Sequence, residues 1–575
     1  MSAEQFIQQK AAAAILAIYG TEVAETSLQV SVTRKEFEGD YTLVTFPLLK
    51  ITRQAPDATG NAIGQWLVDN VKEISAYNSV KGFLNLSFSP LYWNESLQAM
   101  VSDENFGQLP DTGKRIMVEF SSPNTNKPLH LGHIRNNLLG DSVSRLLKAC
   151  GNEVIKATLV NDRGVHICKS MYAWEKLFDG ATPESTGKKG DHLVGDCYVA
   201  YAKMEKEHPE IIDEVHKMLV DWEAGDPHVR ELWTMMNGWV FKGFDETYKA
   251  LGISFDKVDY EHDTYLLGKE LVQKGLDMGV FVKDPDGSVW CDLTADGLDR
   301  KLVLRGDGTS VYITQDLGTA ERRFANYNLD SHVYVVGNEQ DYHFQVLKLI
   351  LAKLGFDWAS QIYHLSYGMV ELPEGKMKSR EGTVVDADDL IQSMYEEAKK
   401  TSEESGKLAD MSEEEKDRLY HMIGLGALKY FIIKVDPKKT MLFNPKESID
   451  FNGNTGPFIQ YTHARICSIL RKATVDFGAA DTLGTEPSAK EVRLVKLLGL
   501  FPAKVAEAGA ALSPAVIANY AYELAKEFNQ YYHDTPILKE ADEAVLKYRL
   551  ALIALMARVL RTAMALLGIE LPERM

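Results

Sequence analysis

Cysteine is scarce in this chain of 575 residues. Only five cysteines are present, and no two of them stand at the C-x-x-C spacing of a zinc site or a redox dithiol. Their odd number also argues against a disulfide framework. The pattern is typical of small buried side chains, and we expect no zinc and no other protein-bound metal.

The sequence also lacks a long apolar run. No segment approaches the roughly 20 residues that a membrane-spanning helix needs. Residues 1–20 have no basic lead-in of the kind found in signal peptides, and Glu4 and Lys10 interrupt their apolar part. We therefore expect a cytoplasmic protein with no membrane partner.

A surplus of positive charge is absent as well. The net charge of −19 argues against a nucleic-acid partner, because phosphate contacts need Lys and Arg. Residues 418–475 depart from this balance, with nine basic residues against three acidic ones. A solvated helix face and a nucleic-acid surface explain this stretch equally well. The nine are Arg418, Lys429, Lys434, Lys438, Lys439, Lys446, Arg465, Arg471 and Lys472.

The length predicts three or four domains, at about 150 residues each. Residues 1–110 combine a helix over 4–18 with short strands over 41–46 and 82–88, which predicts an α+β domain. The Pro- and Gly-containing segment 108–113 is typical of a linker.

Residues 111–385 alternate between strand and helix. This alternation implies a parallel sheet with right-handed crossovers, an α/β doubly wound, Rossmann-like fold. An insertion at about 170–300 interrupts it, with a loop-like stretch over 179–191 and helices over 210–222 and 228–251. The expected strands are 115–120, 153–160, 332–336 and 361–366, and the expected helices are 133–150 and 340–354.

From residue 386 onward the pattern is helical. We place a helical connection over 386–450 and an all-α bundle over 451–575. The expected helices are 390–400, 412–433, 458–474, 489–507, 514–532 and 543–567.

The strongest chemical motif is His130-Leu-Gly-His133, where a strand passes through a loop into a helix. A helix N-terminus offers unpaired N–H groups and a positive dipole end, which suit phosphates. Gly132 leaves room for a flat base against the backbone, and the two histidines share one helix face. Taken alone, two such histidines are more often structural caps.

The context of this tetrapeptide resembles a known family. Residues 119–133, EFSSPNTNKPLHLGH, resemble the first signature of class I aminoacyl-tRNA synthetases, and most closely that of the arginyl branch. Residues 376–380, KMKSR, follow in the order of the second signature. The resemblance makes residues 111–385 the class I catalytic domain. It implies catalytic roles for His130, His133, Lys376, Lys378 and Arg380, and ATP contacts from His130, Gly132, His133 and Lys378.

The second signature departs from the K-M-S-K-S pattern, because Ser379 stands where the family's fourth-position lysine would be. Arginyl enzymes often lack this lysine. Which cation neutralises the pyrophosphate is therefore open among Lys376, Lys378 and Arg380. We favour Lys378 as the principal charge and Arg380 as an auxiliary one.

Two further segments resemble the arginyl enzymes, residues 312–316 (YITQD) and 338–341 (NEQD). A guanidinium is a planar set of donors that prefers a carboxylate, which the resemblance assigns to Asp316 beside the Tyr312 hydroxyl. Asn124 and Gln340 would hold the α-amino and α-carboxyl groups. Glu261 is a second acceptor by a looser match. The expected arginine-binding set is Glu119, Ser122, Asn124, His133, Glu261, Tyr312, Asp316 and Gln340.

The C-terminal part also resembles this family. Residues 451–465, FNGNTGPFIQYTHAR, resemble the start of its anticodon-binding helical domain, and residues 571–575, LPERM, resemble its usual chain end. The resemblance implies tRNA contacts from Tyr461, Arg465 and Met575. It also implies a tRNA-contacting role for residues 1–110.

The resemblance as a whole implies an arginine–tRNA ligase with L-arginine, ATP with Mg²⁺, and tRNA(Arg) as partners. It further implies that arginine activation requires bound tRNA, and we expect a monomer. A small-molecule nucleotidyltransferase would not need the helical C-terminal part. A non-catalytic RNA-binding relative should have lost His133 or Asp316. A cysteinyl enzyme would need zinc ligands, and enzymes for larger aliphatic amino acids would carry a longer insertion for editing.

Overall fold

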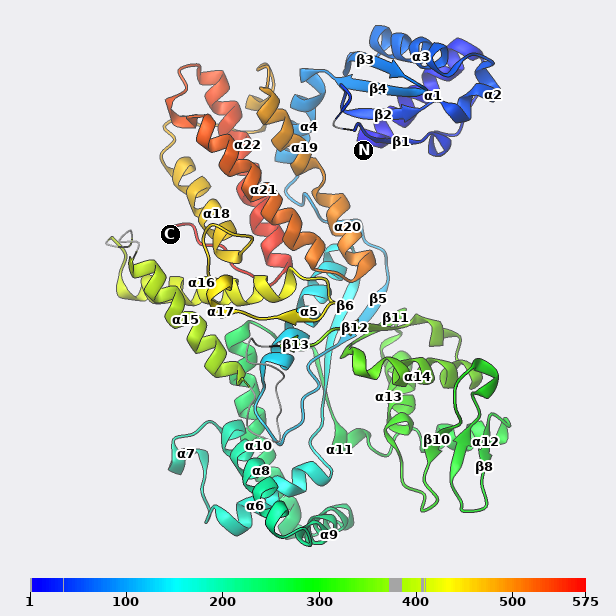
Figure 1. Cartoon of the computed structure of the whole chain (residues 1–575), viewed down its shortest axis with the longest axis vertical. Coiled ribbons are helices and arrows are strands. Elements are labelled where there is room, and N and C mark those ends of the chain that lie inside the picture. Colours follow the sequence, from blue (N-terminus) through cyan, green and yellow to red (C-terminus); the bar gives the residue numbers. More distant parts are fainter. Residues whose placement is uncertain (1–2, 35, 372–384, 405–407, 409) are drawn as a thin grey trace.

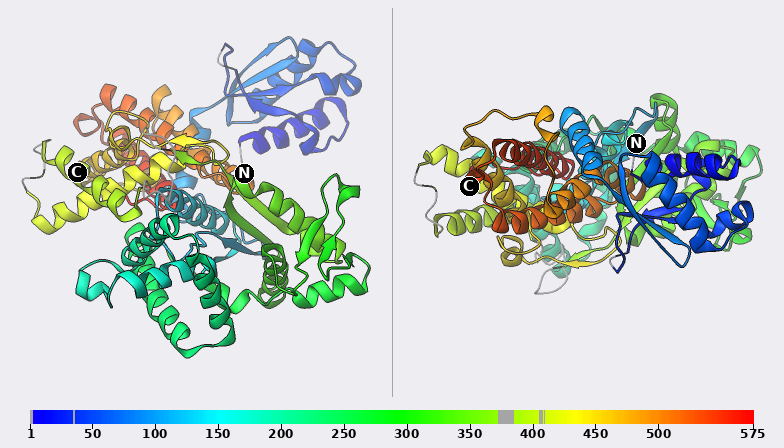
Figure 2. Two further views of the ribbon diagram at one scale, coloured as in Figure 1. Left: turned by 60° about the horizontal axis from the view of Figure 1, so that its bottom comes forward. Right: turned by 90° about the horizontal axis from the view of Figure 1, so that it is seen from above.

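The computed structural model describes residues 3–34, 36–371, 385–404, 408 and 410–575 (Figure 1). Its N-terminal part is an antiparallel sheet in the order β1-β2-β4-β3 that packs against helices, which confirms the expected α+β domain. The views agree that this domain lies at one end of the molecule (Figures 1 and 2). The elements are α1 (Ala3–Tyr19), β1 (Val30–Val32), β2 (Tyr41–Val44), α2 (Leu49–Thr52), α3 (Pro56–Asn70), β3 (Ile74–Val80), β4 (Phe83–Phe88) and α4 (Pro90–Ser102).

The centre of the molecule is a five-stranded parallel sheet in the order β12-β11-β5-β6-β7. The first three strands of this sheet in the sequence, β5, β6 and β7, run from the centre to one edge. The last two, β11 and β12, lie on the other side of β5, which is the doubly wound order. The predicted parallel sheet is therefore confirmed. The strands are β5 (Arg115–Glu119), β6 (Glu153–Val160), β7 (Lys257–Tyr260), β11 (Ser331–Gly337) and β12 (Ile362–Tyr367).

Both faces of this sheet are covered. Ile116 and Val118 of β5 belong to the large core that includes α5 (Leu131–Ala149). Met117 points to a second core, together with α13 (Tyr312–Tyr327) and α14 (Asp341–Lys353). Burial on both faces explains the continuous apolar sequence of β5, as in other parallel sheets.

The segments between the sheet strands form two additional units. Helices α6 to α10 lie between β6 and β7, and a small antiparallel sheet, β10-β9-β8, precedes α13. Residues 179–191, expected as a loop-like stretch, are loop at 179–182 and 187–189 but also contain the short helix α7 and the start of α8. The bounds are α6 (Val165–Leu177), α7 (Pro183–Thr186), α8 (Gly190–Glu207), α9 (Ile211–Ala224), α10 (Pro227–Leu251), α11 (Glu261–Thr264), α12 (Lys269–Asp277), β8 (Phe281–Lys283), β9 (Val289–Cys291) and β10 (Lys301–Leu304).

Residues 451–575 form an all-α bundle, as predicted, whereas the helical connection before them also contains the two-residue strand β14, which pairs with β13. One expected helix, over 489–507, is in fact two, because Pro502 in the first turn of α20 cannot continue the preceding helix. In the described part of the chain, no helix combines the length and apolarity needed to cross a membrane. The elements are β13 (Val370–Glu371), α15 (Ala387–Glu404), α16 (Glu413–Ile433), β14 (Met441–Leu442), α17 (Pro445–Ser448), α18 (Gly456–Arg471), α19 (Ala489–Gly499), α20 (Phe501–Ala511), α21 (Ala515–Asp534) and α22 (Glu543–Leu566).

A buried ion-pair group joins α13 to the sheet. The guanidinium of Arg323 on α13 is 1% exposed and pairs with Glu119 at the end of β5 and with Asp259 of β7, 2.9 Å from Nη2 to Oδ2. Two carboxylates of different strands thus share one buried cation. A buried charge without its partner is costly, so this group strongly constrains where α13 lies.

Replacing Arg323 by Met should destabilise the catalytic part by roughly 3–5 kcal/mol, the scale for leaving buried charges without their partner. The neighbouring Arg322 is one-third exposed and 3.4 Å from the same Asp259. Arg322→Met is therefore the matched control, with an expected loss below about 1 kcal/mol. Urea unfolding followed by circular dichroism measures both, and equal losses would contradict this interpretation.

Candidate active site

The loop between β5 and α5 is held by α5 itself. Ser121 and Ser122 adopt left-handed backbone conformations, with φ of 70° and 43°. The Asn136 side chain of α5 accepts a hydrogen bond from Ser121 N at 2.5 Å and donates to the carbonyl of Val335 on β11 at 2.7 Å. This arrangement supports a strained turn at the carboxyl end of the central strand, where ligands bind in doubly wound sheets.

The two histidines cap α5 reciprocally. Nδ1 of His130 accepts from Gly132 N, and Nδ1 of His133 accepts from His130 N, both at 3.1 Å. Their rings lie 3.9 Å apart between centroids, as the shared helix face predicted. Burial, and then nearby Lys127, lowers the pKa of His130 to about 4, while burial lowers the pKa of His133 well below its usual value. Both rings are therefore neutral at pH 7 and carry their proton on Nε2, which makes each Nε2–H a donor.

Gly132 has a second physical reason to be glycine. A Cβ at this position would lie 2.9 Å from Cε1 of His130. The absent side chain therefore makes room for the His130 ring inside the cap. The expected contact with an adenine base stays a prediction.

The chain after residue 384 returns to this loop. Val385 accepts a hydrogen bond from Leu131 N, and Ala387 N donates to Leu129 O, both at 3.0 Å. Residues 385–387 are thus paired with the residues that start α5. Lys376, Lys378 and Arg380 lie outside the described residues, so the expectations for them stay predictions.

The expected arginine-binding residues lie after the carboxyl ends of three strands or at the start of α13. Ser122 and Asn124 follow β5, Glu261 follows β7, and Gln340 follows β11. In α13, Tyr312 and Asp316 are about one turn apart, and Tyr312 is 77% exposed.

Two carboxyl groups at this edge influence each other electrostatically. Burial raises the pKa of Glu261 to about 7, the nearby Arg163 opposes this shift, and the charges of Asp162 and Asp316 add to it. Glu261 and Asp316 are therefore electrostatic neighbours although 55 positions separate them in the sequence. A cation placed between them would be favoured.

Glu119 is already engaged by the protein. One carboxylate oxygen pairs with Arg323, and the other accepts from Ser122 Oγ at 3.1 Å. A bound guanidinium would have to compete with Arg323 for this group. The expected contact of Glu119 with arginine stays a prediction.

One residue at this edge was missed from the sequence. His343, in the first turn of α14, lies with Nε2 2.5 Å from Oδ2 of Asp316. Its position three residues after Gln340 was the available signal, because residues three apart in a helical turn lie on one face. His343 therefore orients the carboxylate expected to bind the guanidinium.

The expected tRNA-contacting side chains are partly engaged within the bundle. The Arg465 guanidinium lies 4.8 Å from the Tyr461 ring centroid and hydrogen-bonds Asn529. Met575 is half-buried against the core. These contacts fix the aromatic–cation pair on α18, and its contact with tRNA stays a prediction.

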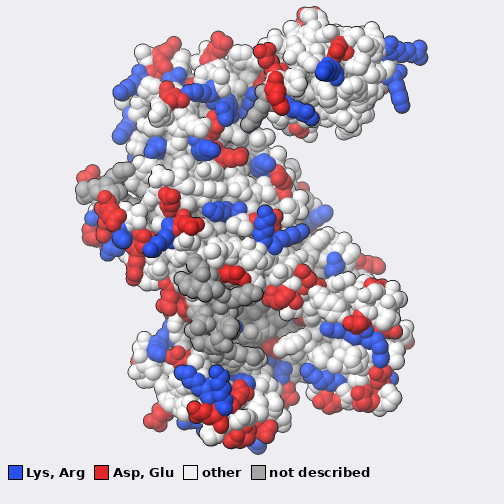
Figure 3. All heavy atoms as spheres, in the orientation of Figure 1, with Lys and Arg blue, Asp and Glu red and all other residues white. Residues whose placement is uncertain are grey.

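The basic stretch over 418–475 is not one surface. Lys429 is buried and donates to Gly568 O at 2.7 Å, and the half-buried Lys434 donates to Asn454 O at 2.8 Å. Basic and acidic side chains alternate over the face that Figure 3 shows. The local count of lysines therefore overstated the exposed positive charge.

Comparisons with known proteins cover the catalytic part and the C-terminal bundle. Residues 96–444 match the family model of the catalytic domain of class I tRNA synthetases (R), and residues 459–575 match the DALR anticodon binding domain. Relatives named arginine–tRNA ligase are similar over their whole length. That of Bacteroides thetaiotaomicron is 56% identical over 99% of this chain and 100% of the relative, and that of Porphyromonas gingivalis is 54% identical over 100% of both.

The chain belongs to the arginyl-tRNA synthetase family. Among solved structures, the arginyl-tRNA synthetase of Thermus thermophilus superposes with a TM-score of 0.82 at 26% identity, covering 100% of both chains. That of Plasmodium falciparum superposes with a TM-score of 0.78 at 20% identity, covering 100% of this chain and 99% of the other, and supports the fold alone. The arginyl-tRNA synthetase fold thus extends over the N-terminal domain, where the sequence resemblance was weakest.

Replacing His133 by Ala should slow amino acid activation by about 10²–10³-fold, the scale for losing one donor to transition-state charge. The Nε2–H donor is lost together with part of the cap. His133→Asn is the matched variant, because an amide can still accept from His130 N. If both variants activate amino acid at the parental rate, His133 is a cap and nothing more.

Proposed function

We propose that this chain is an arginine–tRNA ligase that uses ATP to join L-arginine to tRNA(Arg). Family membership fixes the reaction type, ATP-dependent aminoacylation of tRNA. The observation that supports the amino acid specificity is that Asp316 is an electrostatic neighbour of Glu261, whose pKa is raised by burial and further by the charges of Asp162 and Asp316. Two carboxyl groups around one small region suit a planar guanidinium that offers five donors.

The reaction proceeds in two steps. The arginine carboxylate attacks the α-phosphorus of ATP, forming arginyl-adenylate as the bond to pyrophosphate breaks. A ribose hydroxyl at the 3′ end of the tRNA then attacks the adenylate carbonyl, and AMP leaves. In the first step, His130 and His133 would donate their Nε2–H groups to phosphate oxygens. The protein thus acts mainly by positioning the reactants and stabilising charge.

The arginine subsite would be built from three strand ends. Asp316, oriented by His343, and Glu261 would hold the guanidinium, with Tyr312 beside them. Ser122, Asn124 and Gln340 would hold the α-amino and α-carboxyl groups. Their support is their common place at the carboxyl edge of the sheet.

ATP would enter as its Mg²⁺ complex, the usual form of this substrate. Residues 1–110 and 451–575 would contact the tRNA, supported by their places at the outer end of the molecule and in the helical bundle. The domain boundaries, the tRNA dependence of activation, the monomeric state and the cytoplasmic location stay predictions.

The test of this function is arginine-dependent exchange of pyrophosphate into ATP, with and without total tRNA, followed by aminoacylation. Asp316→Ala should raise the KM for arginine by about 10²-fold or more, because an unpaired guanidinium costs roughly 3–5 kcal/mol. The KM for ATP should change little. Asp307→Asn, which removes an exposed carboxylate elsewhere, is the control.

Parental arginine affinity in Asp316→Ala would remove Asp316 from the subsite. Exchange driven by another amino acid, or by none, would overturn the function itself. A small-molecule nucleotidyltransferase would show exchange with no charging of tRNA.

Arginine binding should depend on pH through Glu261. Its pKa in the folded protein is raised to about 7 by burial, so the free site holds a proton below that pH. A guanidinium favours the ionised carboxylate, and binding must then release this proton. Affinity should therefore rise with pH, by up to about tenfold per unit, and level off above about 7. Calorimetric titrations between pH 5.5 and 8 measure this, and Glu261→Gln should flatten the profile. An unchanged slope in that variant would contradict the assignment.

A further inference from the structure

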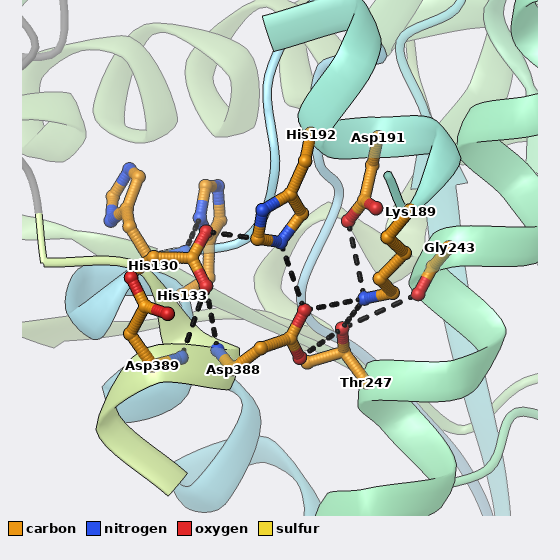
Figure 4. Close-up of polar contacts among 10 residues, drawn as sticks. His130, His133, Lys189, Asp191, His192, Gly243, Thr247, Asp388 and Asp389 are labelled. Atoms are coloured by element: carbon orange, nitrogen blue, oxygen red, sulfur yellow. Dashed lines mark hydrogen bonds and ion pairs between the residues drawn. The ribbon is translucent and has the colours of Figure 1, made fainter. Parts of the chain in front are cut away.

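A polar cluster lies beside the two histidines, where three helices meet (Figure 4). We call it the Asp388 cluster. Lys189 precedes α8 as its N-cap, Thr247 belongs to α10, and Asp388 belongs to the first turn of α15. Side chains almost 200 positions apart in the chain thus come together. The cluster consists of Lys189, Asp191, His192, Thr247 and Asp388.

The Asp388 carboxylate is satisfied from several sides. Its Oδ2 lies 2.6 Å from Lys189 Nζ and 3.0 Å from His192 Nε2, and its Oδ1 accepts from Thr247 Oγ1 at 2.9 Å. Burial alone would raise the pKa of Asp388, but the hydrogen bonds of His192 and Lys189 lower it to about 2. The carboxylate is therefore ionised throughout the physiological range.

The cluster has the composition of a cation site, but the protein supplies the cation. Asp191, His192 and Asp388 place one ligand atom each within 4.8 Å of one another. The Lys189 ammonium lies 2.6 Å from Asp388 and 3.4 Å from Asp191, between the two carboxylates. A divalent ion would have to displace this ammonium, so the geometry favours an internal ion pair.

A short segment connects the cluster to the first signature. Asp386 caps α15 by accepting from Asp388 N at 2.8 Å, and its carboxylate lies 3.4 Å from His192 Nε2. The backbone of Asp386 is bridged to that of His130. Hydrogen bonds from Leu131 N to Val385 O and from Ala387 N to Leu129 O flank this bridge, at 3.0 Å each. The residues held by the cluster therefore form the support against which His130 lies.

The position of the 385–387 segment depends on the positive charge of Lys189. Without the ammonium, Asp388 would lie near the buried carboxylate of Asp191 and near Asp386 with only His192 between them. Like charges at such distances repel. The start of α15 would move away from α8, and the backbone bridge to His130 would move with it.

We propose that Lys189 and Thr247 are positioning residues for amino acid activation, acting through Asp388 and the 385–387 segment on the placement of His130. The proposal rests on the proposed role of His130 toward ATP. The competing possibility is a brace that only joins the helical insertion to the C-terminal part. A brace would affect stability, whereas a positioning group would affect kcat through His130.

The experiment compares two substitutions at Thr247 in the full-length protein. Thr247→Val keeps the shape and removes the hydroxyl that Asp388 and Lys189 both contact, while Thr247→Ser keeps the hydroxyl. Pyrophosphate exchange with tRNA present gives kcat and the KM values for ATP and arginine. We expect Val to lower kcat by about 10-fold to 100-fold, the scale for misplacing a reacting group by up to about 1 Å. Ser should retain most activity, and the KM for arginine should not change.

Lys189→Met, with Lys188→Met as its control, gives a second measurement. Lys188 pairs with Asp196 on the exposed side of α8, so its loss should leave kcat unchanged. Lys189→Met should lower kcat at least as much as Thr247→Val. Melting temperatures show whether each variant is folded. If Lys189→Met does not fold, the comparison of Thr247→Val with Thr247→Ser decides between a positioning role and a brace.

A double-substitution cycle with His130→Ala separates the two roles. If Thr247 acts through His130, Thr247→Val should lower kcat much less in the His130→Ala protein than in the parent. Additive losses, or equal losses in Val and Ser, would overturn the proposal and leave a brace. Parental activity of His130→Ala would overturn the ATP role of His130 and this proposal together. If His130→Ala lowers kcat and Thr247→Val does not, only this proposal is overturned.

Discussion

The buried ion pairs of Arg323 determine how the two halves of the site meet. Asp316 and Arg323 are seven residues apart on α13, two helical turns, so their side chains lie on one face. Asp259 belongs to β7, and Glu261 begins α11 directly after the end of that strand. The pairing of Arg323 with Asp259 therefore holds the helix that carries Asp316 against the end of β7, which Glu261 directly follows. Arg323 also pairs with Glu119 at the end of β5, the strand that leads into the loop of His130 and His133. One cation therefore connects α13 and β7 to β5.

The histidines show that a ring used in a helix cap can still offer a hydrogen-bond donor. Sequence reasoning set a helix cap against a phosphate donor as alternatives. In the structure, Nδ1 of each ring is used in the cap, and this use fixes the proton on Nε2. The cap hydrogen bonds at Nδ1 place the ring proton on Nε2. The lowered pKa values keep both rings neutral, so that each ring has one N–H to donate.

Most of the fold could be predicted because its elements are long and regular. The strand β6 spans the expected residues 153–160, and most helices of the bundle begin and end within a few residues of their predicted bounds. The strand β7 was missed because it is a four-residue edge strand that contains Lys257 and Asp259 and has no apolar run. Only its pairing with β6 defines it.

The local geometry of the candidate site was predictable where residues lie within one motif, and not where distant segments meet. The histidine motif and the Tyr312–Asp316 turn are local patterns. The hydrogen bond from His343 to Asp316, and the meeting of Lys189 with Asp388, depend on tertiary packing between helices that no local pattern encodes. Resemblance to a family supplied roles for single residues, but it did not supply these contacts.

The strand order has a consequence for how the chain acquires its structure. The central strand β5 pairs on one side with β6, which follows soon after it, and on the other with β11, where Ile116 meets Ser331. At ribosomal rates of about 5–20 residues per second, the roughly 200 intervening residues take about 10–40 s to be made. During this interval one edge of an apolar strand has no partner, and such edges are templates for aggregation. The helical insertion, whose contacts are more local, forms faster. The catalytic sheet therefore passes through a vulnerable period during synthesis that its topology imposes and that only the arrival of β11 ends.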